Sequence, residues 1–177
     1  FGHYHKNNAT WFRQMKKPRS YSIALSTRVA RAAVNMAVPN PVGIKAIDPC
    51  CGIGTVMVEA LSMGIDMVGR DINPFIAAGA RTNIAHFGFT AEVTLGDIAD
   101  ITEHYDVAIV DMPYNLYSRI TPEEQFAILV NARRIADTVV IVAIEAMDEM
   151  ISEAGFTITD RCVAKKGGFS RHLMLCQ

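Results

Sequence analysis

The sequence lacks the features that would place it in several common protein classes. It has only four cysteines and no CxxC pair, so the spacing typical of a structural zinc site is absent. No apolar run approaches the roughly 20 residues that a membrane-spanning helix needs, and no secretory signal pattern opens the chain. These absences argue against a membrane protein or a disulfide-rich secreted one. They favour a cytoplasmic protein with reduced thiols.

Acidic residues are missing from the first 47 positions. That stretch holds eight Lys or Arg, whereas the rest of the chain carries nine against 18 Asp or Glu, although the whole has a formal net charge of only -1. A basic segment on an acidic body predicts a polyanionic partner, most often a nucleic acid, and a merely solvated segment is the alternative. Because the chain begins with Phe1 and not Met, we also expect it to come from a longer protein.

The length and the apolar content, 177 residues of which half are hydrophobic, predict one compact domain. From residue 44 onward, short apolar runs alternate with helical stretches, the pattern of a parallel sheet with helices on both faces. We expect strands at 44–48, 66–71, 91–96, 106–111, 138–144, 156–163 and 170–176. Helices are expected from Ser26 or Thr27 to about Met36 and at 54–63, 74–87, 122–136 and 146–154.

The two ends of the chain depart from this alternation. Residues 1–20 show no clean periodicity and predict an irregular arm. The last two strands are joined by "AKKGGFSR", which is too short for a crossover helix, so the seventh strand should run antiparallel to its neighbour. We divide the chain into a basic arm with the first helix, residues 1–40, and an α/β domain, residues 41–177.

The loop after the first expected strand, "DPCCGIGTVMVEA", has the composition of a ligand-binding turn. Gly52 and Gly54 allow the backbone to turn tightly and to approach a ligand just before a helix begins. A dinucleotide-binding loop would have a third glycine at position 57, where this sequence has Met57. Asp48 would also repel a pyrophosphate but attract an ammonium group. A tight turn without a ligand is the alternative.

Two more acids follow the next two expected strands. Asp71, about 20 positions after the glycine loop, is placed to accept hydrogen bonds from both hydroxyls of a ribose. Asp97 lies where an exocyclic amine such as adenine N6 could donate to it. Each acid alone could be a helix cap. Together with Asp48 they predict a pocket for a ligand with an ammonium, a ribose diol and an adenine amine but no phosphate, which describes S-adenosylmethionine.

The segments "DPCCGIGT", "GRDINP", "GDIAD" and "DMPY" resemble the successive motifs of class I methyltransferases. The chain is similar to RNA guanine-N2 methyltransferases that often carry an upstream THUMP RNA-binding domain, and "KPRSYSIALSTRVARAAVNMA" looks like the helix they place before the first motif. The resemblance implies a Rossmann-like fold with a seven-stranded, mostly parallel sheet. It also implies a cofactor site, with S-adenosylmethionine bound by Asp48, Pro49, Gly52, Gly54, Thr55, Asp71, Ile72, Asp97 and Ile98.

The resemblance further implies that "DMPY" corresponds to a motif of enzymes that methylate exocyclic or amide nitrogens. Asp111 and the carbonyl of Met112 would accept the two hydrogens of the target amine, which frees its lone pair for attack. Pro113 would stiffen the loop, and Tyr114 would stack on an extruded base. The family pattern has proline where this chain has Met112. The alternative for this tetrapeptide alone is a simple turn at a strand end.

The expected target is guanine N2 in RNA, with tRNA as partner. Adenine N6 in RNA or DNA, a protein amide, or a catalytically silent RNA-binding module remain alternatives. Ser26 and Thr27 could place helix amides near the methionine carboxylate, or simply cap the helix. The segment "AKKGGFSRH" should project from the same edge of the sheet as the active site, where Lys165, Lys166 and Arg171 could contact phosphate; an ordinary charged hairpin is the alternative. Cys50 and Cys51 are expected to pack in the core.

Overall fold

A single seven-stranded sheet organises the computed structural model, which describes residues 10–20, 24–114, 120–166 and 169–177. Its strands are β1 Lys45–Asp48, β2 Asp66–Asp71, β3 Val93–Leu95, β4 Tyr105–Asp111, β5 Ala136–Ala143, β6 Ile158–Lys166 and β7 Phe169–Cys176. They lie in the order β3-β2-β1-β4-β5-β7-β6. The first five strands are parallel, and β7 runs antiparallel to both β5 and β6. The predicted fold class is confirmed.

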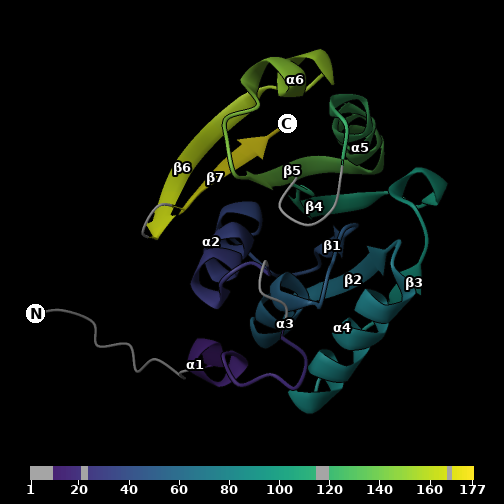
Figure 1. Cartoon of the computed structure of the whole chain (residues 1–177), viewed down its shortest axis with the longest axis vertical. Helices are drawn as coiled ribbons and strands as arrows, with labels where there is room; N and C mark the ends of the chain where they lie inside the picture. Colours follow the sequence, from purple (N-terminus) through teal and green to yellow (C-terminus); the bar gives the residue numbers. More distant parts are fainter. Residues whose placement is uncertain (1–9, 21–23, 115–119, 167–168) are drawn as a thin grey trace, which may run out of the picture.

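Helices cover both faces of this sheet (Figure 1). They are α1 Thr10–Gln14, α2 Thr27–Ala37, α3 Thr55–Ser62, α4 Pro74–His86, the 3-10 turn η1 Ile98–Asp100, α5 Pro122–Ile135 and α6 Asp148–Glu153. Buried side chains of α2, α3 and α4 share one hydrophobic core, whereas those of η1, α5 and α6 share the other. This three-layer arrangement leaves the carboxyl ends of the parallel strands uncovered by helices, which is where such sheets bind ligands.

The central strands show why the sequence forms a fully buried sheet. In β4, Val107 and Ile109 point into one core, and Ala108 and Val110 point into the other, because successive side chains of a strand face opposite sides. All four are at most 4% exposed. The run is therefore continuously apolar and does not alternate with polar residues, as expected for a parallel strand covered on both faces.

Polar side chains fix the starts of α4 and α5. Asn73, not Asp71, caps α4 by accepting hydrogen bonds from the amides of Phe75 and Ile76. Thr121 begins α5 with a capping box. Its hydroxyl oxygen accepts from the Glu124 amide, and the Glu124 carboxylate accepts from the Thr121 amide. At α2, Ser26 is the residue before the helix, but its side chain forms no capping bond.

The expectation of an irregular arm over residues 1–20 is wrong for Thr10–Gln14, which form α1; residues 1–9 lie outside the described residues. The side chain of Gln14 is fully buried, and its Nε2 donates to the Glu59 carboxylate at 2.6 Å and to the Thr55 carbonyl at 3.3 Å. A five-residue helix is marginal on its own. These contacts with α3 stabilise α1, and no sequence periodicity of so short a segment reveals them.

Asn83 on α4 ties the segment after α1 to the glycine loop. Its Oδ1 accepts from the Arg19 amide at 2.9 Å, while its Nδ2 donates to the carbonyls of Arg19 at 3.0 Å and Ile53 at 2.9 Å. The side chain is fully buried, so each of these bonds satisfies a group that water cannot reach. Asn83 thereby positions the loop between β1 and α3.

We predict that Asn83→Ala lowers the free energy of unfolding by about 2 to 3 kcal/mol, because it leaves buried backbone groups of Arg19 and Ile53 without partners. The matched control is Asn35→Ala, at an exposed position of α2, which should change it by no more than about 0.5 kcal/mol. Urea unfolding of the three proteins measures both values. Equal effects of the two substitutions would contradict this account of the loop.

Candidate active site

The site begins at the point where the strand order reverses, between β1 and β4. β1 connects onward to β2 on one side, and β4 connects to β5 on the other, so the crevice at their carboxyl ends is the topological switch point of the sheet. Asp48 is the last residue of β1, and Asp111 is the last residue of β4. The fold therefore brings together two carboxylates that are 63 positions apart in the sequence.

The Asp48 carboxyl is almost completely buried, at 2% exposure. Burial raises its pKa well above the ordinary value, and the neighbouring Asp111 and Asp71 carboxylates raise that pKa further. One compensating contact is the Cys50 amide, which donates to Asp48 Oδ1 at 3.3 Å. A nearby cation would relieve this accumulation of negative charge.

Asp111 is half-buried, but its Oδ1 is shielded from solvent, and among the described residues no group donates a hydrogen bond to that oxygen. Burial raises the pKa of Asp111 from its ordinary value of 3.8 to about 7, while the positive charge of Arg171 lowers it. An unsatisfied buried carboxylate oxygen costs free energy. At the carboxyl end of a strand beside the switch point, it is a candidate for a group that accepts a hydrogen bond from a ligand.

Asp71 connects the first two loops of the site. Its Oδ2 accepts from the Gly52 amide at 2.9 Å, and its Oδ1 accepts from the Asn73 amide at 2.9 Å. Each carboxylate oxygen has a second lone pair, so Asp71 can still accept hydrogen bonds from ribose hydroxyls. The residue therefore also holds the glycine loop in place, a role that its sequence position alone did not indicate.

The glycine loop has the backbone that its sequence predicts. Gly52 and Gly54 adopt left-handed φ values of 53° and 78°, which favour glycine. Met57 is fully buried, and a Cβ placed on Gly69 of β2 would lie only 2.3 Å from its sulfur. The close helix-strand contact that a third loop glycine gives in dinucleotide folds is here made by a glycine on the strand. Met57 is thus a packing residue.

The remaining predicted cofactor residues lie around this loop. Pro49 precedes Cys50, and Ile72 is 69% exposed at the end of β2. Asp97 caps η1 through the Ala99 amide at 2.8 Å, and the Ile98 side chain is buried, so only the Ile98 backbone could reach a ligand. The Thr55 hydroxyl is bonded to the Lys17 ammonium at 2.7 Å, a contact that the sequence did not predict.

The "DMPY" loop follows β4 directly, and residues 115–119 lie outside the described residues. The Met112 amide donates to the Val142 carbonyl at 2.8 Å, which extends the pairing of β4 with β5. Gln125 Nε2 donates to the Pro113 carbonyl at 3.2 Å and so fixes the loop to α5. The Tyr114 ring is 7% exposed. Sequence reasoning missed Gln125, for which no motif gives a signal.

A cavity of about 240 Å³ lies against this loop, lined by Met112, Pro113, Tyr114, Gln125, Ala143 and Glu145 among others. It lies between the end of β4 and the end of β5, next to the Asp111 side of the switch point. A planar group placed there would contact the "DMPY" loop on the side that faces away from the glycine loop. The cavity therefore provides a second ligand position, distinct from the one formed by Asp48, Gly52 and Asp71.

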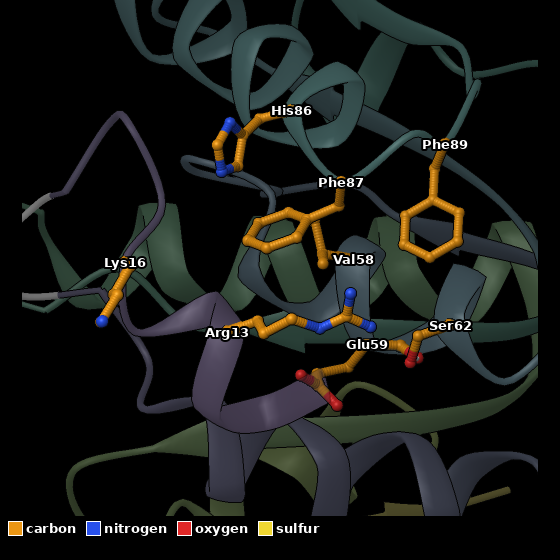
Figure 2. A pocket seen from close by; sticks show the side chains of 8 residues that line it. All are labelled: Arg13, Lys16, Val58, Glu59, Ser62, His86, Phe87 and Phe89. Atoms are coloured by element: carbon orange, nitrogen blue, oxygen red, sulfur yellow. The ribbon is translucent and has the colours of Figure 1, made fainter. Parts of the chain in front are cut away.

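Basic residues of the arm divide into two groups. Lys17 bonds Thr55, and Arg31 pairs with the buried Glu59 carboxylate at 3.2 Å, so both are structural. Arg13 and Lys16 instead line a cavity of about 310 Å³ with His86, Phe87 and other residues of α3 and α4. Figure 2 shows the Arg13 side chain reaching into this cavity from α1. The cavity lies by the last turn of α3, away from the carboxyl ends of the strands.

The parallel sheet with an antiparallel β7, and the acids at its carboxyl ends, define the class I methyltransferase architecture. The model of the family described as "RMKL-like, methyltransferase domain" matches residues 14–131. The chain belongs to this family.

Relatives and a solved structure agree with this assignment. The chain is 35% identical over 119 residues to a tRNA (guanine(10)-N2)-dimethyltransferase of Methanothermobacter thermautotrophicus, covering 63% of this chain and 34% of that protein. It is 32% identical over 105 residues to the enzyme of the same name from Pyrococcus abyssi, covering 56% and 31%. The chain thus spans about a third of the length of these curated relatives. Magnesium protoporphyrin IX methyltransferase of Synechocystis PCC 6803 has the same fold, with a TM-score of 0.72 at 17% identity over 96% of this chain and 92% of its own.

No helix among the described residues is long and apolar enough to cross a membrane. No group of three or more His, Cys, Asp or Glu side chains in the described ranges could hold a metal ion.

We predict that Asp111→Asn stabilises the protein, and more so at pH 8 than at pH 5. The pKa of Asp111 is raised to about 7 in the folded state, so the folded protein holds this proton more tightly than the unfolded chain does. The native state therefore loses stability as the pH rises from about 4 to about 7. Asparagine cannot ionise and escapes this loss, which amounts to at most about 4 kcal/mol at pH 8.

Denaturant unfolding at the two pH values measures this difference. The control is Asp137→Asn, because the Asp137 side chain is 74% exposed and lies outside the site. It should change the stability little at either pH. A stabilisation by Asp111→Asn that is the same at both pH values would show that ionisation of the Asp111 carboxyl does not destabilise the folded protein.

Proposed function

We propose that this chain is the catalytic domain of an S-adenosylmethionine-dependent methyltransferase that acts on an exocyclic base nitrogen of RNA, with guanine N2 of tRNA as the favoured target. The observation that carries the proposal is the pair of carboxyls at the two strand ends of the switch point, the buried Asp48 and the half-buried Asp111 with its unsatisfied Oδ1. Such a pair favours a ligand that brings positive charge. The membership of a methyltransferase family and the names of the two tRNA-modifying relatives support the same conclusion.

The residues present fit S-adenosylmethionine. The buried Asp48 carboxyl would face its ammonium group, and Gly52 leaves the backbone open beside it, whereas Gly54 packs closely against Ala80 of α4. Asp71 keeps lone pairs for the ribose hydroxyls, Ile72 offers exposed apolar surface to the adenine ring, and Asp97 would accept from the adenine amine. When bound, this cofactor supplies a sulfonium methyl group with a good leaving group. The likeness to a methyltransferase solved with the bound cofactor supports this assignment.

The chain's own residues would then prepare the nucleophile. A guanine amine is a poor nucleophile because its lone pair is delocalised into the ring. Asp111 Oδ1, which has no partner among the described residues, would accept one of the two amine hydrogens. Gln125 already donates to the Pro113 carbonyl, so we assign the second hydrogen to the Met112 carbonyl. Correct placement of the amine is the main contribution of this loop.

The base itself would occupy the cavity beside Tyr114, where the ring could stack on it. Phosphates of the RNA would meet the basic arm at Arg13 and Lys16, because Lys17 and Arg31 are engaged inside the fold. We propose that residues 41–177 carry the catalysis and that the basic segment, residues 1–40, connects them to an upstream THUMP-like RNA-binding domain. Four free thiols agree with a cytoplasmic location.

We predict that the chain transfers a labelled methyl group from S-adenosylmethionine to a tRNA transcript and that nucleoside mass spectrometry finds N2-methylguanosine. Asp111→Ala should lower the single-turnover rate about 10²- to 10³-fold, as loss of one preorganised polar group does. It should leave the affinity for S-adenosylhomocysteine nearly unchanged. Asp71→Ala should instead weaken that affinity by about 1.5 to 3 kcal/mol, the range for hydrogen bonds to a charged group.

The control variant is Asp137→Ala, which should behave as wild type. N6-methyladenosine or a methylated protein amide would replace the proposed target and keep the mechanism. Cofactor binding without transfer to RNA, DNA or protein would favour a silent RNA-binding module. Tight NAD binding with no response to S-adenosylmethionine would contradict the proposal altogether.

A further inference from the structure

Arg171 reaches the "DMPY" loop from a strand that no motif of the sequence connects with it. β7 pairs with β5 so that Ala143 lies opposite His172, and β5 pairs with β4 so that Val142 lies opposite Asp111. The register of three strands thus brings Arg171 to the carboxyl end of β4. This residue lies outside the segment matched by the family model, residues 14–131.

The guanidinium of Arg171 contacts Tyr114 in two ways. Its Nη2 donates to the Tyr114 hydroxyl at 2.6 Å, and its Cζ lies 4.5 Å from the centre of the Tyr114 ring, the geometry of a cation–π contact. A planar guanidinium can stack and donate at the same time, which an ammonium cannot do. The tyrosine ring is therefore fixed by both its face and its hydroxyl.

The same guanidinium acts on Asp111. The negative charge of Asp111 acts on three neighbouring groups, Asp48 from β1, Cys50 from the following loop, and Tyr114, while the positive charge of Arg171 acts on Asp111. Of these, Arg171 is the cation, and its charge opposes the effect of burial on the pKa of Asp111. A carboxylate accepts hydrogen bonds with both oxygens, whereas a neutral carboxyl gives up part of that capacity to its own proton.

We propose that Arg171 is a positioning residue of the methyl-transfer site: it holds the Tyr114 ring in place beside Asp111 by a hydrogen bond and a cation–π contact, and its positive charge there favours the carboxylate form of Asp111. This inference rests on the proposed function. It adds a residue of the last strand to a site that the sequence motifs confine to the first four strand ends. Two features of the site, ring orientation and carboxylate charge, depend on one side chain.

Two substitutions separate these roles. Arg171→Lys keeps the positive charge but loses the planar contact with the ring, and Arg171→Met loses both. The matched control is Arg161→Met on β6, which removes an exposed arginine bonded to Asp148 and lies outside the site. Unfolding temperatures of all three proteins show whether each variant is folded. Should Arg171→Met unfold, Arg171→Lys together with Tyr114→Phe still tests the inference.

The first measurement is the single-turnover rate of methyl transfer to tRNA between about pH 5.5 and 9, at saturating cofactor. The wild-type rate should rise through a limb near the Asp111 pKa of about 7. Arg171→Met should move this limb to higher pH by about one unit and lower the plateau about 10- to 100-fold. Arg171→Lys should lower the plateau and leave the limb in place. A merely structural role would lower the rate equally at every pH, which would overturn the inference.

The second measurement does not depend on activity. The carboxyl carbon of Asp111, labelled with ¹³C and assigned with Asp111→Asn, is titrated by NMR in the wild type and in the variants. Its midpoint should rise in Arg171→Met and stay near the wild-type value in Arg171→Lys and Arg161→Met. An unchanged midpoint in Arg171→Met would overturn the inference even if the enzyme is active. Absence of methyl transfer by the wild-type chain would overturn the proposed function. A shifted Asp111 midpoint in Arg171→Met would still support the effect of the Arg171 charge on Asp111.

Discussion

The site depends on one electrostatic constraint, the burial of two carboxyls at adjoining strand ends. Asp48 and Asp111 are brought together because β1 and β4 are neighbours at the reversal of the strand order. In this position the Asp48 carboxyl and the Oδ1 of Asp111 are shielded from solvent, and the two negative charges disfavour each other. A fold selected for stability alone would place apolar residues there. The repulsion is tolerable if the site works with a cation bound, which links the architecture of the sheet to the chemistry proposed for it.

The face of the sheet behind the glycine loop supplies the rigidity that this arrangement needs. Glu59 on α3 is buried between Gln14 and Arg31, and Asn83 holds the loop from α4. Removing one partner of a buried charge is costly, so this network fixes α1, α2 and α3 relative to each other. Much of the basic arm therefore belongs to the scaffold. Only part of its charge is available for a polyanionic partner.

Sequence reasoning predicted the sheet well, because a buried parallel strand such as β4 is a continuous apolar run, whereas in the helices between strands apolar residues recur at helical spacing. It also found the acids, since the carboxyl ends of parallel strands gather on one edge. It could not find α1, whose stability comes from Gln14 meeting Glu59, nor the contact of Arg171 with Tyr114. Both depend on which atoms meet across the fold, in one case through the register of three strands. The function of Asp71 as a brace of the glycine loop was hidden for the same reason.

The central claim is that the buried carboxyls are matched to a cationic cofactor, and proton linkage tests it most directly. Calorimetric titrations near pH 7 in buffers of different ionisation enthalpy measure the protons released on binding. S-adenosylmethionine should release protons, because its ammonium and sulfonium favour the ionised forms of Asp48 and Asp111. Methylthioadenosine, which has the same nucleoside but neither cation, should release far fewer. Equal release by the two ligands, or none with S-adenosylmethionine, would contradict the account.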